Sequence, residues 1–336
     1  MTSLTSHAPL PLQPLCDSKG RLLDEAIGWS NRPQVDCTLH GHAGRRKRWN
    51  HWCITTPDWM LSLTQADLDY LGYAAAYFLD LQSGQACSFS QFRLFGFGSH
   101  LPDHPQQSHE FNHPRLQLRV AEHTGRTRIT VNAPDIGGQA LHVALDIQRP
   151  AHLDSVNLVV PLGPRSFHAT SRQLGLPCNG SVQLGQQHYS CVGGQSFAAL
   201  DFGRGVWPLN SHWTRAAFAA PGGIAGNFGA GWTDYSDQTE NTLWFGGELQ
   251  HLDAPISIAP TTPGLLAPWQ LNSADDAVSL TFTPRQRHQA YRRLGPFYAD
   301  TQQWFGHYQG VLRGPRGERV PVNNALGWLG ETHARW

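Results

Sequence analysis

Charged residues are scarce in this sequence, and they balance. Asp, Glu, Lys and Arg make up 15% of the 336 residues, with 25 basic and 25 acidic side chains, whereas about a quarter of an average protein is charged. Proteins whose main partner is a nucleic acid or an anionic membrane usually carry a basic excess. The composition therefore argues against both as the main partner.

Long apolar runs are also missing. No segment approaches 18 uncharged apolar residues, and the most apolar stretch, LGYAAAYFLDL, is interrupted by Asp80. No membrane-spanning helix is therefore predicted. Residues 1–20 lack the basic start and the continuous apolar core of a signal peptide. We expect a cytoplasmic protein with no stable membrane insertion.

Metal, nucleotide and hydrolase motifs are absent. None of the six cysteines forms a C-x-x-C pair, and no Cys/His spacing suggests zinc. Reduced, mostly buried thiols are expected. The sequence also lacks a G-x-S-x-G elbow, a P-loop, H-E-x-x-H, and a G-x-G-x-x-G between strand and helix. We predict no metal and no cofactor, and the oligomeric state stays open.

What the sequence does contain is alternation and tryptophan. From about residue 50, apolar and polar residues alternate in short segments separated by Gly, Pro, Asn and Asp, which predicts an all-β sandwich or barrel. Helical periodicity is scarce, and Gln286–Leu294 is the best short candidate for a helix. There are too many strands for one barrel, so we expect two β lobes. Twelve tryptophans suit a cavity for a bulky apolar ligand or a thick β core.

Two segments in the first half place charges beside aromatic residues. GRRKRWNHW puts four basic residues before Trp49 and Trp52, which would hold an anionic substrate group or form a solvated turn before a strand. In TQADLDY, Asp67 and Asp69 would share one face of a strand. Two like charges held close would raise one pKa, as a general acid requires. The alternative is a turn or a cap.

Asp201 is the acidic residue least typical of a surface. It ends an apolar strand and shares a face with Phe197 and Ala199 by alternation. An acid on an inward face needs a partner, and Arg204, three residues on, could supply it. A buried proton donor and a structural ion pair are both consistent with this pattern.

The segment GNFGAGWTDYSDQTENTLWF holds three carboxylates among aromatic residues. Its spacing lacks the central glycine of a calcium loop. If its end is a strand, Glu240 shares a face with Trp244 and is a candidate for a cavity. Asp237 is expected in a solvated turn, and Asp234 fits either place.

A further pair of candidates lies in QQWFGHYQG near the C-terminus. His307 and Tyr308 can transfer protons or donate hydrogen bonds beside the aromatic residues. The alternative is that both pack in a wall or core.

Several stretches together resemble one bacterial family, the domain of unknown function 2804, from about residue 15 to the C-terminus. They are GRLLDEAIGWSNRP, GRRKRWNHWCITTPD, ADLDYLGYAAAYFLDLQSG, DFGRGVWPLNSHW, GWTDYSDQTEN, FGHYQG and LGWLGETHARW. The family name carries no activity, so this resemblance implies organisation more than function.

A second resemblance centres on Asp201. The Gly/Phe-rich strand that it ends, with the tryptophans that follow, is similar to a segment of the carotenoid hydratase and AttH-like proteins, which share their architecture with tocopherol cyclase. The resemblance implies two consecutive lipocalin-like β-barrel or sandwich lobes, 1–165 with an irregular N-terminal arm and 166–336, with a ligand cavity in or between them. It also implies an apolar ligand and a buried acid that protonates a carbon–carbon double bond. Leu200 and Phe202 flank Asp201 here, so the histidine beside the hydratase acid is absent.

The leading hypothesis is a cofactor-independent hydratase, isomerase or cyclase acting on a small apolar unsaturated, isoprenoid- or lipid-like molecule. Asp201 would be the general acid, Glu240 or Asp234 the base or water-positioning group, and Arg204 would orient a carboxylate. An apolar wall able to stabilise positive charge would be formed by Trp207, Trp213 and Trp232. The alternatives are a non-catalytic lipid or isoprenoid carrier and a carbohydrate-active β protein.

Overall fold

The chain folds almost entirely into β-structure. The computed structural model describes residues 12–96, 99, 101–234 and 236–336. The only helix in these residues is a short 3-10 turn, η1 (Asp24–Ala26), so no described helix could cross a membrane. A small parallel pair, β1 (Gln13–Pro14) with β3 (Val35–Asp36), precedes two large sheets. The predicted all-β fold of two lipocalin-like lobes is confirmed.

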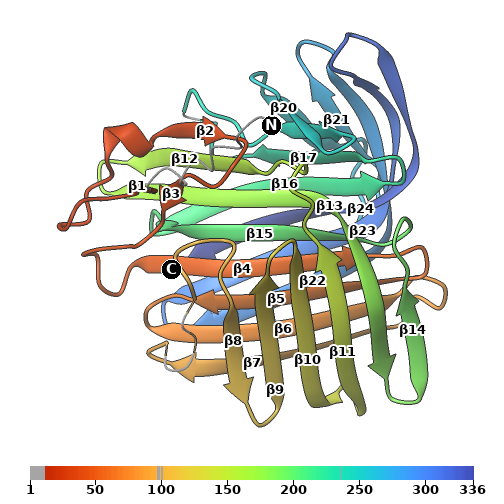
Figure 1. The fold of residues 1–336 in the computed structure, drawn as a ribbon, viewed down its shortest axis with the longest axis horizontal. Helices are drawn as coiled ribbons and strands as arrows, with labels where there is room; N and C mark the ends of the chain where they lie inside the picture. The colour runs from red at the N-terminus through yellow and green to blue at the C-terminus, as the bar shows by residue number, and fades with distance from the viewer. Residues whose placement is uncertain (1–11, 97–98, 100, 235) are drawn as a thin grey trace, which may run out of the picture.

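The first sheet has thirteen strands, paired along the path β7-β6-β5-β4-β15-β13-β11-β10-β9-β8, with β12, β2 and β14 attached beside it. Its strands are β2 (Gly28–Ser30), β4 (Arg46–Thr55), β5 (Trp59–Asp67), β6 (Leu71–Asp80), β7 (Ala86–Leu94), β8 (His109–His113), β9 (Leu116–His123), β10 (Arg126–Ile136), β11 (Gln139–Gln148), β12 (Val156–Gly163), β13 (Ser166–Leu184), β14 (Gln187–Cys191) and β15 (Phe197–Val206). Figure 1 shows the sheet folded over itself, with β8 to β11 standing across β4, β5 and β6. Apolar side chains from both layers fill the space between them.

The long strand β13 makes the corner between these layers. Its register against β15 shifts between Gln173 and Leu176, and Gly175 has a φ of +71°. That backbone conformation favours glycine. The first half of β13 pairs with β12 and β15, and the second half pairs with β11 and β14. Strands that switch layers at a bulge are typical of orthogonal β packing.

The second sheet has nine strands in the order β19-β18-β17-β16-β24-β23-β22-β21-β20. Its strands are β16 (Asn210–Ala220), β17 (Ile224–Ala230), β18 (Thr242–Phe245), β19 (Glu248–His251), β20 (Ile256–Pro260), β21 (Trp269–Ser273), β22 (Val278–Leu294), β23 (Phe297–Arg313) and β24 (Arg319–Arg335). The predicted helix at Gln286–Leu294 is wrong, because these residues form the second half of β22 and pair one by one with β23.

The change of sheet falls between β15 and β16, not at the predicted boundary of 165 and 166. Strands β13 to β15 complete the first sheet, since β15 pairs with β4 and β13 pairs with β11. The join therefore lies between Val206 and Asn210.

Strand β15 is buried on both faces, and this positions the candidate site. Leu200 and Phe202 point into the core of the first sheet. The alternate residues face the second sheet, and an apolar cluster that includes Cys53, Phe305 and Trp328 joins the two sheets. A strand covered on both sides has no solvated face, so Asp201 lies buried between the sheets.

Candidate active site between the two sheets

Polar side chains form a row across neighbouring strands of the first sheet, on the face toward the second. Asp201 on β15 lies directly opposite Arg172 on β13 and opposite His51 on β4. His51 in turn lies opposite Thr64 on β5, and its Nδ1 is 2.8 Å from the Thr64 Oγ1. Cross-strand neighbours on one face have adjacent side chains. The fold therefore gathers an acid, a guanidinium and an imidazole from three strands.

An ionic cluster connects this row to the second sheet. Arg172 bridges two acids: its Nη1 is 2.7 Å from the Asp201 Oδ1, and its Nε contacts the Glu240 Oε2. Arg215 on β16 contacts the other oxygen of Asp201. The Asp201 side chain is 7% exposed and that of Glu240 is 0% exposed. Two carboxylates and two guanidiniums cancel in charge, which lowers the free-energy cost of burying them together.

Glu240 is fixed by neutral donors as well. The Trp232 indole Nε1 is 2.5 Å from its Oε1, and the Asn227 Nδ2 donates to both its carboxylate and its main-chain carbonyl. Gly229 on β17 leaves the room for this carboxylate, because a Cβ there would overlap it. The sequence predicted Glu240 on a strand face with Trp244, but Glu240 lies just before β18 and its tryptophan partner is Trp232.

The surroundings shift the pKa values of these groups. Burial raises the pKa of Asp201, although the positive charge of Arg172 opposes the effect. For Arg172 the balance is reversed: burial would lower its pKa, but the attraction of Asp201 and Glu240 raises it. Burial and the charge of Arg172 lower the pKa of His51 to about 4. His51 is therefore neutral at physiological pH and able to act as a base.

Aromatic residues enclose one end of the cluster. Trp207 and Trp232 lie within an apolar group with Trp49 and Trp213. The ring centroids of Trp207 and Trp232 are 5.9 Å apart. The buried ring of His168 stacks on Trp49 and accepts a hydrogen bond at Nδ1 from the Trp207 indole, at 3.1 Å. The structure thus gathers the three tryptophans predicted as a wall, packed against one another.

Arg204 does not pair with Asp201. Consecutive strand residues point to opposite faces, so the two side chains lie on opposite sides of β15. The Arg204 guanidinium, fully buried, donates to the carbonyls of Pro102, Trp49 and Gly203, and to the Asn50 side chain. It therefore holds the first lobe together, and the predicted partnership is wrong.

Two of the predicted acids lie outside the cluster. Asp69 forms ion pairs with Arg46 and Arg48 and accepts hydrogen bonds from the main chain. The Arg46 hydrogen bonds and charge outweigh burial and lower its pKa, the opposite of the predicted direction. Asp234 is exposed, and its side chain accepts a hydrogen bond from Gly231 N at the turn. Both have structural roles, because neither faces the Asp201 row.

The remaining candidates lie in or beside other cores. Trp52 is buried inside the first lobe, on the opposite face of β4 from His51. Tyr308 is buried in the core of the second sheet and donates to the Trp328 carbonyl. His307, its neighbour on β23, points to the other face of that strand, where burial lowers its pKa. None of them contacts the ionic cluster in the hydrogen bonds and ion pairs of the described residues.

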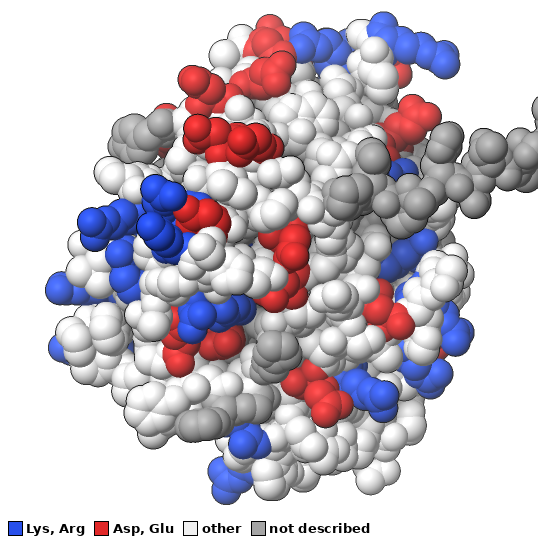
Figure 2. Space-filling model, turned by 60° about the vertical axis from the view of Figure 1, so that its left-hand side comes forward, with Lys and Arg blue, Asp and Glu red and all other residues white. Residues whose placement is uncertain are grey.

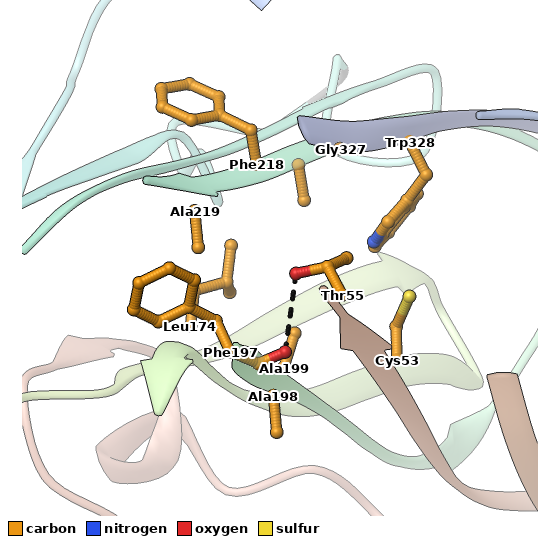
Figure 3. Close-up of a pocket in the computed structure, with 11 residues that line it drawn as sticks. Cys53, Thr55, Leu174, Phe197, Ala198, Ala199, Phe218, Ala219, Gly327 and Trp328 are labelled. Atoms are coloured by element: carbon orange, nitrogen blue, oxygen red, sulfur yellow. Dashed lines mark hydrogen bonds between the residues drawn. The ribbon is translucent and has the colours of Figure 1, made fainter. Parts of the chain in front are cut away.

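Two hollows of the structure are lined by none of the side chains of the ionic cluster. One is a void of about 10 Å³ between the sheets, lined by Cys53, Leu174, Ala217 and Trp328 among others (Figure 3). It has room for about one water molecule. The other, of about 680 Å³, is open to solvent and lined mainly by glutamines of the first sheet, such as Gln139 and Gln183. The side chains of the cluster are only 0–13% exposed, so the two sheets are closed over it.

Metal ligation finds no support in the described residues. No group of three or more His, Cys, Asp or Glu side chains among them could hold a metal ion. The residues that the sequence motifs missed are Arg172, Arg215 and His51. The signal for His51 was present, since it lies in the basic and aromatic segment GRRKRWNHW.

Known proteins resemble this chain mainly in fold. Kievitone hydratase from Nectria haematococca superposes with a TM-score of 0.55 at 12% identity, covering 98% of both chains. A putative AttH from Nitrosomonas europaea superposes with a TM-score of 0.50 at 10% identity, covering 85% of this chain and 92% of its own. No curated protein matches the chain by sequence. The family profile matches residues 8–336, and the chain therefore belongs to the family described as Domain of unknown function (DUF2804).

Proposed function

We propose that the protein is a cofactor-independent acid–base enzyme that adds water to a carbon–carbon double bond of a small apolar molecule. One observation carries this proposal: Asp201, a buried carboxyl whose pKa is raised, lies directly opposite the neutral imidazole of His51. A proton donor and a proton acceptor side by side are the minimum for hydration. The hydratase-like fold supports the same class of reaction.

The reaction would proceed in two proton transfers. The Asp201 carboxyl donates its proton to one carbon of the double bond, and positive charge develops on the other carbon. Water attacks that carbon while His51 accepts a proton from the water. Transfer of this proton from His51 to the Asp201 carboxylate restores both groups. Overall, one water molecule is added, with one C–H and one C–O bond formed.

The neighbouring groups would support these steps. Indole faces attract positive charge, so Trp49 and Trp232 would stabilise the developing cation. Arg172 would hold the Asp201 carboxylate in place after the proton leaves, through the contact that it makes now. Glu240, held by Arg172, supplies the negative charge that balances one of the two guanidiniums while Asp201 carries its proton. Because the sheets are closed over the cluster, the substrate would enter when they separate.

A carrier of lipid-like molecules is the second candidate. It is favoured by the position of the acids, since neither Asp201 nor Glu240 lines either of the two hollows. A carrier needs no acid at its ligand, and the cluster would then be a structural joint between the sheets. The carbohydrate-active alternative has less support, because the Arg172 guanidinium occupies the space between the two acids, where a sugar would have to bind.

Isotope labelling distinguishes these functions even while the substrate is unidentified. The purified protein is incubated with an apolar extract of its host in water enriched in ¹⁸O or in D₂O, and the extract is analysed by mass spectrometry. A hydratase adds both one ¹⁸O and one deuterium to its product. An isomerase or cyclase introduces deuterium without oxygen. A carrier enriches a compound without changing its mass.

The D201N and H51Q variants connect the labelling to the site. Both should abolish incorporation, whereas D237N, a change at an exposed turn, should leave it intact. Labelling that persists in D201N would overturn the assignment of Asp201 as the acid. Enrichment without any label in the wild-type protein would establish the carrier instead.

A further inference from the structure

Large apolar side chains are exposed where β7 meets the tip of the β22–β23 hairpin. We call this the hairpin patch; its most exposed members, with their exposed fractions, are Phe92 (44%), Leu94 (61%), Phe95 (72%), Tyr291 (59%), Leu294 (46%) and Tyr298 (38%). A cluster of exposed apolar side chains of this kind marks an interaction site more often than scattered ones do.

Contacts between the sheets hold the two parts of the hairpin patch together, and the hairpin contributes both of its faces. Arg292, Leu294 and Phe297 face the first sheet, whereas Tyr291 and Tyr298 stack on each other on the opposite face. Phe92 packs on Tyr73 with ring centroids 5.2 Å apart, and the Arg292 guanidinium lies 5.0 Å above the Tyr73 ring. Phe297, next to Tyr298 on the hairpin, stacks on Tyr70 at 5.1 Å. The hairpin of the second sheet is therefore anchored on the edge of the first.

The charge of the hairpin patch departs from that of the chain. Segment 284–300 contains four arginines and one carboxylate, that of Asp300 opposite Tyr291, and segment 86–96 contains one arginine and no carboxylate. The whole chain has equal numbers of basic and acidic residues, and on the face shown in Figure 2 the two kinds are interspersed. A neutral total thus conceals a local excess of positive charge.

We propose that the hairpin patch docks reversibly on an anionic membrane surface. Tyr, Phe and Leu side chains enter the boundary between headgroups and acyl chains, and arginines beside them attract anionic headgroups. The patch offers both, since Arg292 and Arg293 lie between Tyr291 and Leu294 on the hairpin. Such docking is peripheral and needs no membrane-spanning segment.

A second copy of the chain fits this surface less well. Strand β7 is the edge of its sheet, so edge-to-edge pairing of two copies is the other use of the patch. It would bring the arginines of both copies together, with Asp300 as the one carboxylate of segments 86–96 and 284–300 to pair with them. Like charges placed opposite one another are destabilising, whereas anionic lipids neutralise them.

The hairpin patch also leads to the candidate site, and this step rests on the proposed function. Phe92, Tyr73, Ala66, Trp49 and Gly203 are cross-strand neighbours in one row of the first sheet. The row runs beside the row that contains Asp201, on the same face. This row connects the patch with the surroundings of the acid, and an apolar substrate dissolved in the membrane would approach the site along it when the sheets separate.

Co-sedimentation with lipid vesicles tests the docking. The full chain is mixed with vesicles of phosphatidylcholine alone or with about one third phosphatidylglycerol. We expect binding to the anionic vesicles and weakening of that binding as salt rises. R292Q/R293Q should lower the apparent affinity by about 10- to 30-fold, and L94S/L294S should abolish binding. The matched controls, R115Q/R119Q and L265S/L266S, change exposed residues of the same types elsewhere and should bind as the wild type does.

Three outcomes would overturn the docking: no binding to anionic vesicles, equal loss in the control variants, or a dimer in solution that L94S/L294S dissociates while vesicles are not bound. Far-UV circular dichroism of each variant verifies that it is folded. D201N should bind vesicles as the wild type does. Binding by D201N together with absence of labelling in the wild-type protein would mean that the membrane docking stands and the proposed enzyme does not.

Discussion

Replacement of Asp201 by asparagine gives the sharpest test of the proton-donor role, because it needs no substrate. The raised pKa means that the native state holds the proton of Asp201 more tightly than the unfolded chain does. The contribution of Asp201 to stability is therefore fully present below the unfolded pKa, about 3.9, and is lost as pH rises through the native pKa. Asn resembles the protonated carboxyl and does not titrate.

The two interpretations of Asp201 predict opposite trends with pH. For a proton donor, D201N costs about 0.5–1.5 kcal/mol near pH 4 through altered hydrogen bonds. This cost falls as pH rises, by up to about 1.4 kcal/mol per pH unit. For a structural ion pair with Arg172 and Arg215, D201N leaves guanidiniums uncompensated and costs about 3–5 kcal/mol at pH 7. In that case the cost rises with pH.

The assay is urea unfolding between pH 4 and 8, followed by tryptophan fluorescence. Wild type and D201N are measured in parallel, and D237N serves as the control for loss of an exposed carboxylate. Equal slopes of the transitions are required, since a change of slope would mean a change in the states compared. A destabilisation by D201N that grows with pH would refute the assignment of Asp201 as the proton donor.

Three further substitutions test the surroundings of the cluster. His51 has a native pKa of about 4, so it lowers the free energy of unfolding by up to about 3 kcal/mol as pH falls from about 6.5 to 4. H51Q should remove this loss, which urea unfolding across the same pH range measures. A free energy of unfolding that falls as steeply with pH in H51Q as in the wild type contradicts the prediction. G229A should destabilise by about 1–3 kcal/mol because its methyl group overlaps Glu240, whereas G330A, which meets no atom closer than 3.4 Å, should be tolerated; equal melting temperatures would count against the packing described. R204K should lower the melting temperature as strongly as R204M, because one ammonium group cannot make all the hydrogen bonds that the Arg204 guanidinium donates. A melting temperature of R204K close to that of the wild type would show that the positive charge alone suffices.

Local patterns in the sequence predicted the strands and the burial of Asp201. Alternation is a property of each strand alone, so it gave the correct face for Asp201, with Phe197 and Ala199 on the same side. It failed at Gln286–Leu294, where mixed polar and apolar residues suit either structure and the pairing with β23 decides the outcome.

The partners of Asp201 could not be predicted, because they come from other strands. Arg204 is close in sequence but points to the opposite face, whereas Arg172 becomes a neighbour only through the register of β13 against β15. That register depends on the bulge near Gly175. Arg215 belongs to the second sheet, and its contact depends on how the two sheets pack. Such contacts follow from tertiary structure and have no signature in a single sequence.

The position of the cluster links proton donation to closure of the two sheets. Asp201 and Arg172 belong to the first sheet, whereas Arg215 lies on β16 of the second sheet and Glu240 lies just before β18 of that sheet. Separation of the sheets would take Glu240 and Arg215 from Asp201 and expose its carboxyl to water. Burial is the largest cause of its raised pKa, so exposure would return that pKa toward its ordinary value and release the proton. Closure would raise the pKa again, so the carboxylate would take up a proton from water as the sheets close and hold it in the closed site.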